Sequence, residues 1–249
     1  GQSPQLPVVI DYPAALALRQ MSMVHDELPK YLLAPEVSAL LHYVPDLRRK
    51  MLLATLWNTG ARINEALALT RGDFSLAPPY PFVQLATLKQ RTEKAARTAG
   101  RTPAGQQTHR LVPLSDSWYV SQLQTMVATL KIPLERRNKR TGRTEKARIW
   151  EVTDRTVRTW IGEAVAAAAT DGVTFSVPVT PHTFRHSYAM HMLYAGIPLK
   201  VLQSLMGHKS ISSTEVYTKV FALDVAARHR VQFSMPESDA VTMLKNRHA

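Results

Sequence analysis

The chain has 249 residues, 45% of them hydrophobic, which is enough for one large domain with an ordinary apolar core. It has no cysteine, which excludes disulfides and thiolate metal sites, and no apolar run approaches the about 20 residues that cross a bilayer. The formal net charge of +12 favours a polyanionic partner such as nucleic acid. We therefore expect a cytoplasmic, nucleoid-associated protein with no membrane segment.

The first third of the chain has the apolar periodicity of helices. Helices are expected over 14–24, after Pro13 in a first turn, and over 36–44, 46–59 and 63–70. The apolar runs at 79–88 and 108–114 predict two strands, joined by a long, polar and basic connection. The prediction is a mainly α fold with a small antiparallel β-sheet.

Helices resume in the second half of the sequence. They are expected over 115–130 and 153–172, with Thr153 as N-cap, and the basic stretch 135–148 between them should be a loop or hinge. Three short helices should follow, over 180–196 and 198–207 and from about Ser213 through Tyr217. A helix over 221–231 and an amphipathic one over 236–248, a candidate for docking on a partner, complete the prediction.

Positive charge is concentrated between residues 86 and 148. This segment holds fourteen Lys and Arg against four acids, a surplus of ten, and it contains few aromatic residues. A solvated surface is one interpretation; a face that grips DNA phosphates is the other, and scarce aromatics favour a duplex over single strands. The candidate DNA-binding residues are Lys94, Arg97, Arg101, Arg137, Lys139, Arg140 and Arg143.

The segment "TPHTFRHSYAM", residues 180–190, contains side chains suited to a phosphate. His182 and Arg185 share one helix face in the first turn after Pro181, where free amides and the helix dipole favour an anion. His182 and His186 also have the spacing of a helical metal pair, but an arginine stands where hydrolytic motifs place an acid. The metal interpretation is therefore the weaker one, and His186 and His191 are expected to pack or to form hydrogen bonds.

Four ordered blocks of the chain resemble the tyrosine recombinases, also called the phage integrase family. His182-x-x-Arg185 is followed by "LMGH", which ends at His208, and by Tyr217 nine residues later. Upstream, "GAR" ending at Arg62, with Glu65 three residues on, resembles the other arginine box of the family. The stretch "YLLAPEVSALL" resembles the usual opening of its catalytic domain, so the resemblance covers residues 31–222.

The resemblance implies a set of residue roles. Tyr217 would be the nucleophile that forms a 3′-phosphotyrosyl bond to DNA, and Glu65 would support an arginine or the helix entry. The family also uses a lysine in a strand turn, for which Lys89 is the better match and Lys94 stays possible. The implied catalytic residues are Arg62, Lys89, His182, Arg185, His208 and Tyr217.

The resemblance also implies the partners and the kind of reaction. Site-specific recombination of double-stranded DNA without metal, ATP or other cofactor is expected, by a homo-oligomer, a tetramer on two sites, with accessory DNA-bending proteins possible. The biological roles in the family include resolution of plasmid or chromosome dimers and integration or excision of mobile DNA. The expected single-domain organisation favours a plasmid-type resolvase or a small mobile-element integrase. A DNA-binding module without cleavage and a type IB topoisomerase-like enzyme remain alternatives.

The expected domain organisation is simple. Residues 31–249 would form the catalytic domain with a C-terminal exchange segment, and residues 1–30 an N-terminal helix or arm. Family members carry about a domain of core-binding residues before the catalytic domain, so this clamp is expected to be missing, truncated or reduced to one helix here.

Overall fold

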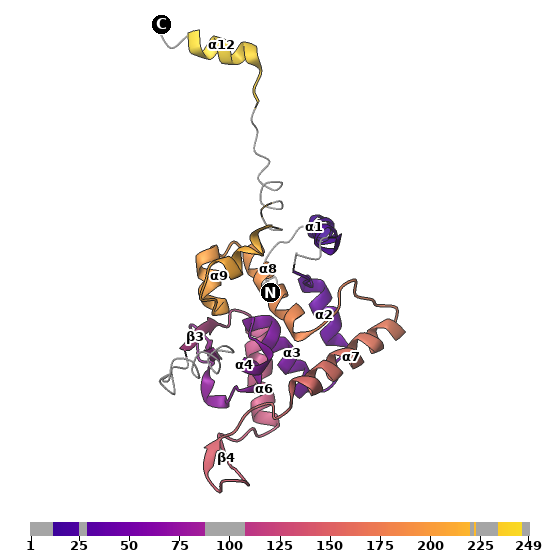
Figure 1. Ribbon diagram of the computed structural model, residues 1–249, viewed down its shortest axis with the longest axis vertical. Coiled ribbons are helices and arrows are strands. Elements are labelled where there is room, and N and C mark those ends of the chain that lie inside the picture. Colours follow the sequence, from indigo (N-terminus) through magenta and orange to yellow (C-terminus); the bar gives the residue numbers. More distant parts are fainter. Residues whose placement is uncertain (1–11, 25–28, 88–107, 220–221, 223–233, 246–249) are drawn as a thin grey trace, which may run out of the picture.

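The computed structural model describes residues 12–24, 29–87, 108–219, 222 and 234–245. This part of the chain is mostly helical with a small antiparallel sheet, as the sequence predicts (Figure 1). No helix in these ranges is long and apolar enough to span a membrane. The helix expected over 221–231 lies, apart from residue 222, outside the described residues.

Helix α3 (Leu47–Thr59) is the centre of the core. It packs against α8 (Pro181–Tyr194) and α6 (Ser117–Thr129), and most of its residues from Met51 to Leu56 are fully buried. The Asp46 carboxylate caps its start by accepting from Arg49 N at 2.9 Å, and Gly60 ends it in the left-handed conformation at φ 66°. The end of this buried helix therefore has a fixed place in the interior.

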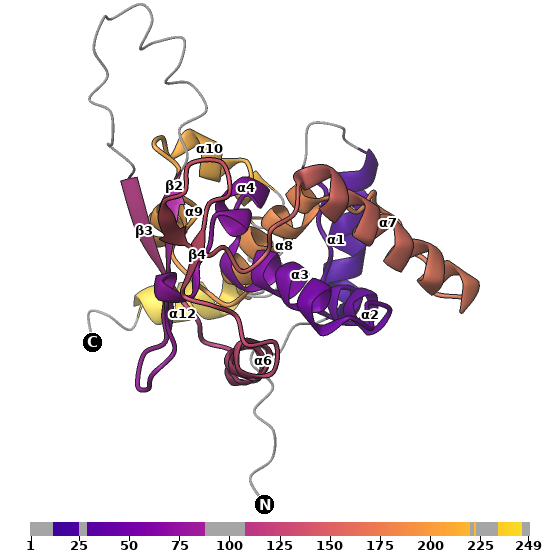
Figure 2. The same ribbon diagram turned by 90° about the horizontal axis from the view of Figure 1, so that it is seen from below.

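The remaining helices surround this centre. Figure 2 shows strands β2 and β3 on one side of the central helices and α1, α2 and α7 on the other. The helix α12 lies apart from the body in Figure 1, and none of its residues is buried. The bounds of these elements are α1 Tyr12–Val24, α2 Ala34–His42, α4 Ile63–Leu67, the 3-10 helix η1 Arg71–Asp73, α7 Asp154–Thr170, α9 Leu199–Met206, α10 Ser212–Glu215 and α12 Glu237–Lys245.

Three antiparallel strands form the sheet in the order β1-β2-β3, with bounds Phe74–Ser75, Phe82–Thr87 and Thr108–Pro113. The two longer strands were predicted, whereas β1 is too short to show a period. Val83 pairs with Val112 and Leu85 with Arg110 in the register of β2 and β3. Because side chains alternate along a strand, Arg110 shares the buried face with Val112, and Leu111 between them is 59% exposed.

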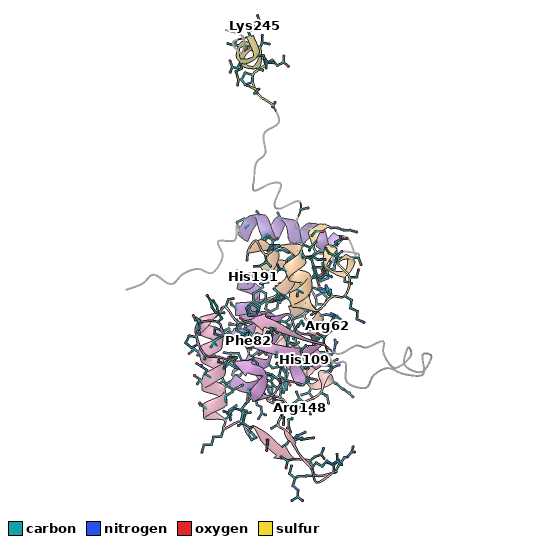
Figure 3. All side chains as sticks on the ribbon, turned by 90° about the vertical axis from the view of Figure 1, so that its left-hand side faces the viewer. Arg62, Phe82, His109, Arg148, His191 and Lys245 are labelled. Carbon is teal, nitrogen blue, oxygen red and sulfur yellow. The ribbon has the colours of Figure 1, made fainter. Side chains whose placement is uncertain are left out.

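The prediction of a loop or hinge at 135–148 is wrong. Strands β4 (Glu135–Arg137) and β5 (Thr144–Lys146) form an antiparallel hairpin that projects from the body at the end opposite α12 (Figures 1 and 3). Charged cross-strand contacts hold it, with Arg136 Nε donating to Glu145 at 3.0 Å. Gly142, at φ 71°, closes the turn with a bond to the carbonyl of Asn138. The strands carry no apolar alternation, so the period that reveals a strand is absent.

The position expected for Tyr217 within a helix is also wrong. Helix α10 ends at Glu215, and Tyr217 lies in the turn that follows. At the end of α10, Tyr217 N donates to Thr214 O, three residues back, at 3.1 Å, so the chain tightens into a turn instead of continuing the α-helix. The tyrosine is thus held by a short, tightly turned segment.

Candidate active site

Arg185, in the first turns of α8, joins the ends of two other helices. One guanidinium nitrogen donates to Gly60 O at 2.6 Å and the other to Met206 O at 2.7 Å. These carbonyls belong to the C-terminal ends of α3 and α9, where helix carbonyls lack a partner. Burial, followed by the charge of Arg62, lowers the pKa of Arg185 to about 10, so this 4% exposed group stays cationic at neutral pH.

Two glycines allow these close approaches. Gly60 and Gly207 have φ values of 66° and 69°, in the left-handed region that other residues rarely adopt. A Cβ on Gly60 would lie 2.3 Å from Tyr188 Cδ1, and one on Gly207 would lie 2.8 Å from Arg110 Nη1. Both helix ends therefore require glycine for backbone conformation and for space.

Glu65 connects two arginines beneath the site. Its carboxylate accepts a hydrogen bond from Arg62 N at 2.8 Å. It also forms a bidentate pair with Arg110, accepting from Nη1 and Nη2 at 2.8 and 2.9 Å. Burial by itself raises the pKa of Glu65, but the bonds and charge of Arg110, aided by Arg62, outweigh it and lower that pKa. Arg110 Nε also donates to Leu205 O at 2.7 Å, so the pair is tied to α9.

The three arginines differ in how much each can offer a ligand. The side chain of Arg62 is 32% exposed and lies 3.4 Å from Glu65, whereas that of Arg110 is 7% exposed and bonds to Glu65, Thr87 and Leu205 O. One carboxylate opposes the three guanidinium groups, so positive charge remains in excess. Glu65 neutralises Arg110, whereas Arg185, although buried, bonds only to carbonyl oxygens and His208 and keeps its positive charge. The charges of Arg62 and Arg185 can therefore attract an anion, and of these two Arg62 is the one with a partly exposed side chain.

His208 follows Gly207 and binds Arg185 directly. Its Nε2 lies 3.1 Å from Arg185 Nη2 and its Nδ1 lies 2.8 Å from Thr214 Oγ1. Because guanidinium only donates, Nε2 is the acceptor, which assigns the proton to Nδ1. Burial and then Arg185 lower the pKa of His208 to about 4, so the ring is neutral at neutral pH. We call Arg62, Glu65, Arg110, Arg185 and His208 the arginine cluster.

Tyr217 lies beside the arginine cluster. Its hydroxyl is 2.8 Å from His186 Nδ1, and the residue is only 3% exposed. Burial raises the pKa of the phenol to about 12, although the charges of Arg185 and Arg62 are close enough to lower it in part. The His182 ring stacks on His186 at 5.7 Å and 15° between planes, and burial lowers the pKa of His182 as well.

The structure thus gathers most of the sequence-predicted site residues. Hydrogen bonds join Arg62 to Glu65 and Arg185 to His208, and Tyr217 and His182 both contact His186. Four other candidates, Lys89, Lys94, Arg97 and Arg101, lie outside the described residues. The four remaining basic candidates lie around the tip of the β4–β5 hairpin and apart from the cluster: Arg137, Lys139, Arg140 and Arg143.

Two residues of the site were missed in the sequence. Arg110 was counted only within the basic segment, yet its spacing of two from the buried Val112 indicated that it points inward. His186 was expected to pack or to form a hydrogen bond, and its partner proves to be the Tyr217 hydroxyl. The identity of that partner had no local signal, since 31 residues separate the two.

The chemistry of the site follows from its charges. Two available guanidinium groups, two neutral imidazoles beside them and a protonated phenol suit an anionic, electrophilic group such as a phosphodiester. In the described ranges, no three His, Asp or Glu side chains gather in a way that could hold a metal ion. The arrangement can bind a phosphate and present a nucleophile to it.

Comparisons with known proteins agree with this chemistry. Residues 30–223 match the model of the phage integrase family. The chain is 98% identical over 245 residues to a resolvase from Escherichia coli, covering 98% of this chain and 94% of that protein. It is 34% identical over 202 residues to tyrosine recombinase XerD of Mycobacterium leprae, covering 78% of this chain and 57% of that protein.

A solved structure shares the fold. The XerA recombinase superposes with a TM-score of 0.58 at 20% identity, over 83% of this chain and 67% of that one. The family model matches most of the chain, and the resolvase is nearly identical to this chain over almost its whole length. The protein therefore belongs to the phage integrase family and is a tyrosine-type site-specific recombinase.

Proposed function

We propose that this recombinase acts as a resolvase and that Tyr217 is its nucleophile, attacking a DNA phosphate held by Arg62 and Arg185. The observation that carries the proposal is the convergence of the phenol and both guanidinium groups, whose charges act on the pKa of Tyr217. The relative named a resolvase, identical at 98% of 245 positions, supports the biological role. Resolution would separate joined DNA copies by recombining two sites.

Side chains of the protein would supply every group that the proposed cleavage of DNA needs. Tyr217 Oη forms a bond to phosphorus while the bond from phosphorus to the 5′ oxygen breaks, which leaves a 3′-phosphotyrosyl link and a 5′ hydroxyl. Arg62 and Arg185 would hold the non-bridging oxygens as negative charge develops, and His208, which accepts from Arg185, would keep that guanidinium in place. A lysine, Lys89 or Lys94, would protonate the leaving oxygen, and His182 would assist proton transfer. Attack by a 5′ hydroxyl of another strand then reverses the step.

DNA would be gripped by a second, separate surface. The hairpin turn carries four cations and no acid between residues 137 and 143, at the exposed end of a projecting ribbon (Figure 1). A two-stranded ribbon fits the major groove, and cations at its tip can reach phosphates on either side. We assign this hairpin to double-stranded DNA.

The assembly would be a tetramer on two sites, with residues 31–249 as catalytic domain and residues 1–30 as an arm. Helix α12 supports this part of the proposal, because it packs on nothing in the described chain and exposes Val241, Met243 and Leu244. Such a helix is suited to dock on a neighbouring subunit. Removal of residues 236–249 should leave binding to a single site intact and impair pairing of sites and cleavage.

A nicked DNA duplex that carries the recombination site tests the reaction. After cleavage near the nick, the short 5′-hydroxyl fragment diffuses away, so the covalent complex accumulates and is seen on a denaturing gel. We expect wild-type protein to form it in the presence of EDTA and Tyr217→Phe to form none. Equal adduct from both proteins would refute the assignment of the nucleophile.

A further inference from the structure

The nearest partner of the Tyr217 hydroxyl is a histidine outside the motif that identified the site. His186 Nδ1 lies 2.8 Å from Tyr217 Oη, and no other hydrogen bond to that oxygen is found in the described part of the chain. His182, the expected acid or base, stacks on the face of the His186 ring instead. The ring order therefore places His186 between His182 and the phenol.

The charge state of His186 suits it to accept a proton. Burial, then the nearby His182 and Arg185, lower the pKa of His186 to about 4, so the ring is neutral at neutral pH. The groups that face it are His182 and Arg185 on its own helix and Tyr217 from the turn after α10. The phenol, with its pKa raised to about 12, is protonated and donates to Nδ1, which leaves the ring proton on Nε2.

We propose that His186 Nδ1 takes the proton of Tyr217 as the phenol attacks DNA, and returns it when the strand is rejoined. This inference rests on the proposed function, because it needs Tyr217 as nucleophile. Oη forms its bond to phosphorus, its proton passes to Nδ1, and the electron pair of the broken bond leaves with the 5′ oxygen. Any proton donated to that oxygen comes from a different residue.

The timing of the transfer resolves the mismatch in proton affinity. Before it attacks, Tyr217 holds its proton far more tightly than His186 would, so proton transfer ahead of the attack is unfavourable. As the bond from Oη to phosphorus forms, electron density leaves the phenol oxygen and its proton becomes acidic. A base already 2.8 Å away can then accept it within the same step. The resulting imidazolium lies near the phosphate, whose negative charge stabilises it.

Substitution of His186 by asparagine separates the hydrogen bond to the phenol from the transfer of its proton. In His186→Asn, the side-chain oxygen takes the place of Nδ1 and can accept the phenol hydrogen bond, but it cannot take the proton. His191→Asn is the matched control, since His191 lies on the same helix and packs on Trp57 at 4.9 Å, away from Tyr217. Each variant is compared with wild type for DNA affinity, thermal stability and single-turnover cleavage of the nicked duplex.

We expect His186→Asn to bind DNA within about twofold of wild type and to cleave about 10²- to 10⁴-fold more slowly, the usual range for a lost general base. His191→Asn should cleave at the wild-type rate. A duplex with sulfur in place of the leaving 5′ oxygen, which departs without a proton, should not restore the rate of His186→Asn. Cleavage by His186→Asn at the wild-type rate, or its rescue by sulfur, would overturn the proposal.

Two further results keep this inference separate from the proposed function. If wild type forms no adduct, or if Tyr217→Phe forms one, the assignment of the nucleophile is wrong. If wild type cleaves and His186→Asn cleaves at the same rate, only the role of His186 is wrong. If His186→Asn does not fold, nitrogen NMR of wild type labelled at histidine decides. We expect an unprotonated His186 Nδ1 at pH 7 whose signal moves in Tyr217→Phe, whereas a protonated Nδ1 would overturn the proposal.

Discussion

The arginine cluster and the β4–β5 hairpin both present cations, but they hold them in opposite ways. Arg110 and Arg185 are buried and bind backbone carbonyls and Glu65 at 2.6 to 2.9 Å. The side chains of the hairpin tip lie in solvent, on two strands that pair through their backbones and through the contact between Arg136 and Glu145. Buried cations have fixed geometry and little screening, whereas exposed ones keep their mobility and respond to salt. The first suits chemistry at one phosphate and the second suits a grip on many.

The largest effect should come from breaking the buried pair. In Arg110→Met, the carboxylate of Glu65, with 0% of its side chain exposed, loses its main partner. We expect the free energy of unfolding to fall by about 3–5 kcal/mol, measured by denaturant titration. The double variant Arg110→Met with Glu65→Leu should recover part of the loss, since no buried charge is left. A loss below about 1 kcal/mol in the single variant would contradict this account.

The next effect concerns the geometry of Arg185. Lysine keeps the charge but cannot bind Gly60 O, Met206 O and His208 together, as the guanidinium does. Arg185→Lys should therefore cleave about 10²- to 10³-fold more slowly in single turnover, comparable to the loss of one donor to a developing charge. Arg49→Lys, on the outer side of α3 where Arg49 lies over Trp160, should leave the rate unchanged. Equal rates for the two variants would show that charge alone suffices.

The hairpin should affect affinity rather than stability. Replacing its four tip cations with alanine should make the slope of log affinity against log salt shallower by up to about 3.6, since each phosphate contact contributes about 0.9. The free energy of unfolding should change by less than about 0.5 kcal/mol. Replacing the three arginines with lysine should keep the slope, and an unchanged slope in the alanine variant would remove the hairpin from the DNA interface. The residues are Arg137, Lys139, Arg140 and Arg143.

The smallest effect is a dependence of stability on pH. The pKa of both His186 and His208 is lowered to about 4 in the folded chain, so between pH 6.5 and 4 the unfolded chain binds more protons than the native one. Their contribution to stability is complete above pH 6.5 and is lost as the pH falls toward 4. The melting temperature should fall over this window, less so in His186→Asn, while His109→Asn, at an exposed position, should retain the wild-type decrease. A flat profile for wild type would contradict the neutral state of these rings.

Local patterns explain why most helices could be predicted. Asp46 and Gly60 mark the two ends of α3, and Thr153 caps α7 by accepting from Thr156 N, all within a few residues of the elements they limit. The β4–β5 hairpin was missed because its strands depend on charged pairs and on Gly142 rather than on apolar alternation. A pattern search for alternation finds nothing in "ERRNKRTGRTEK".

The site could be predicted only in part, for a related reason. Spacing along the chain related His182 to Arg185 and Arg62 to Glu65. The bond from Arg110 to Glu65 spans 45 residues and depends on the packing of the sheet against α9. The bond from His186 to Tyr217 spans 31 residues and depends on the packing of the turn that holds Tyr217 against α8. Such long-range contacts have no local period, so only the folded chain reveals them.

The central claim is that the oxygen of Tyr217 becomes covalently joined to DNA beside two arginines. Wild-type protein should be trapped on the nicked duplex, digested, and the peptide that carries nucleotide identified by mass spectrometry. We expect a nucleotide 3′-phosphate on Tyr217, within the peptide that follows Lys209. Nucleotide on any other residue, or cleavage that leaves no residue modified, would contradict it.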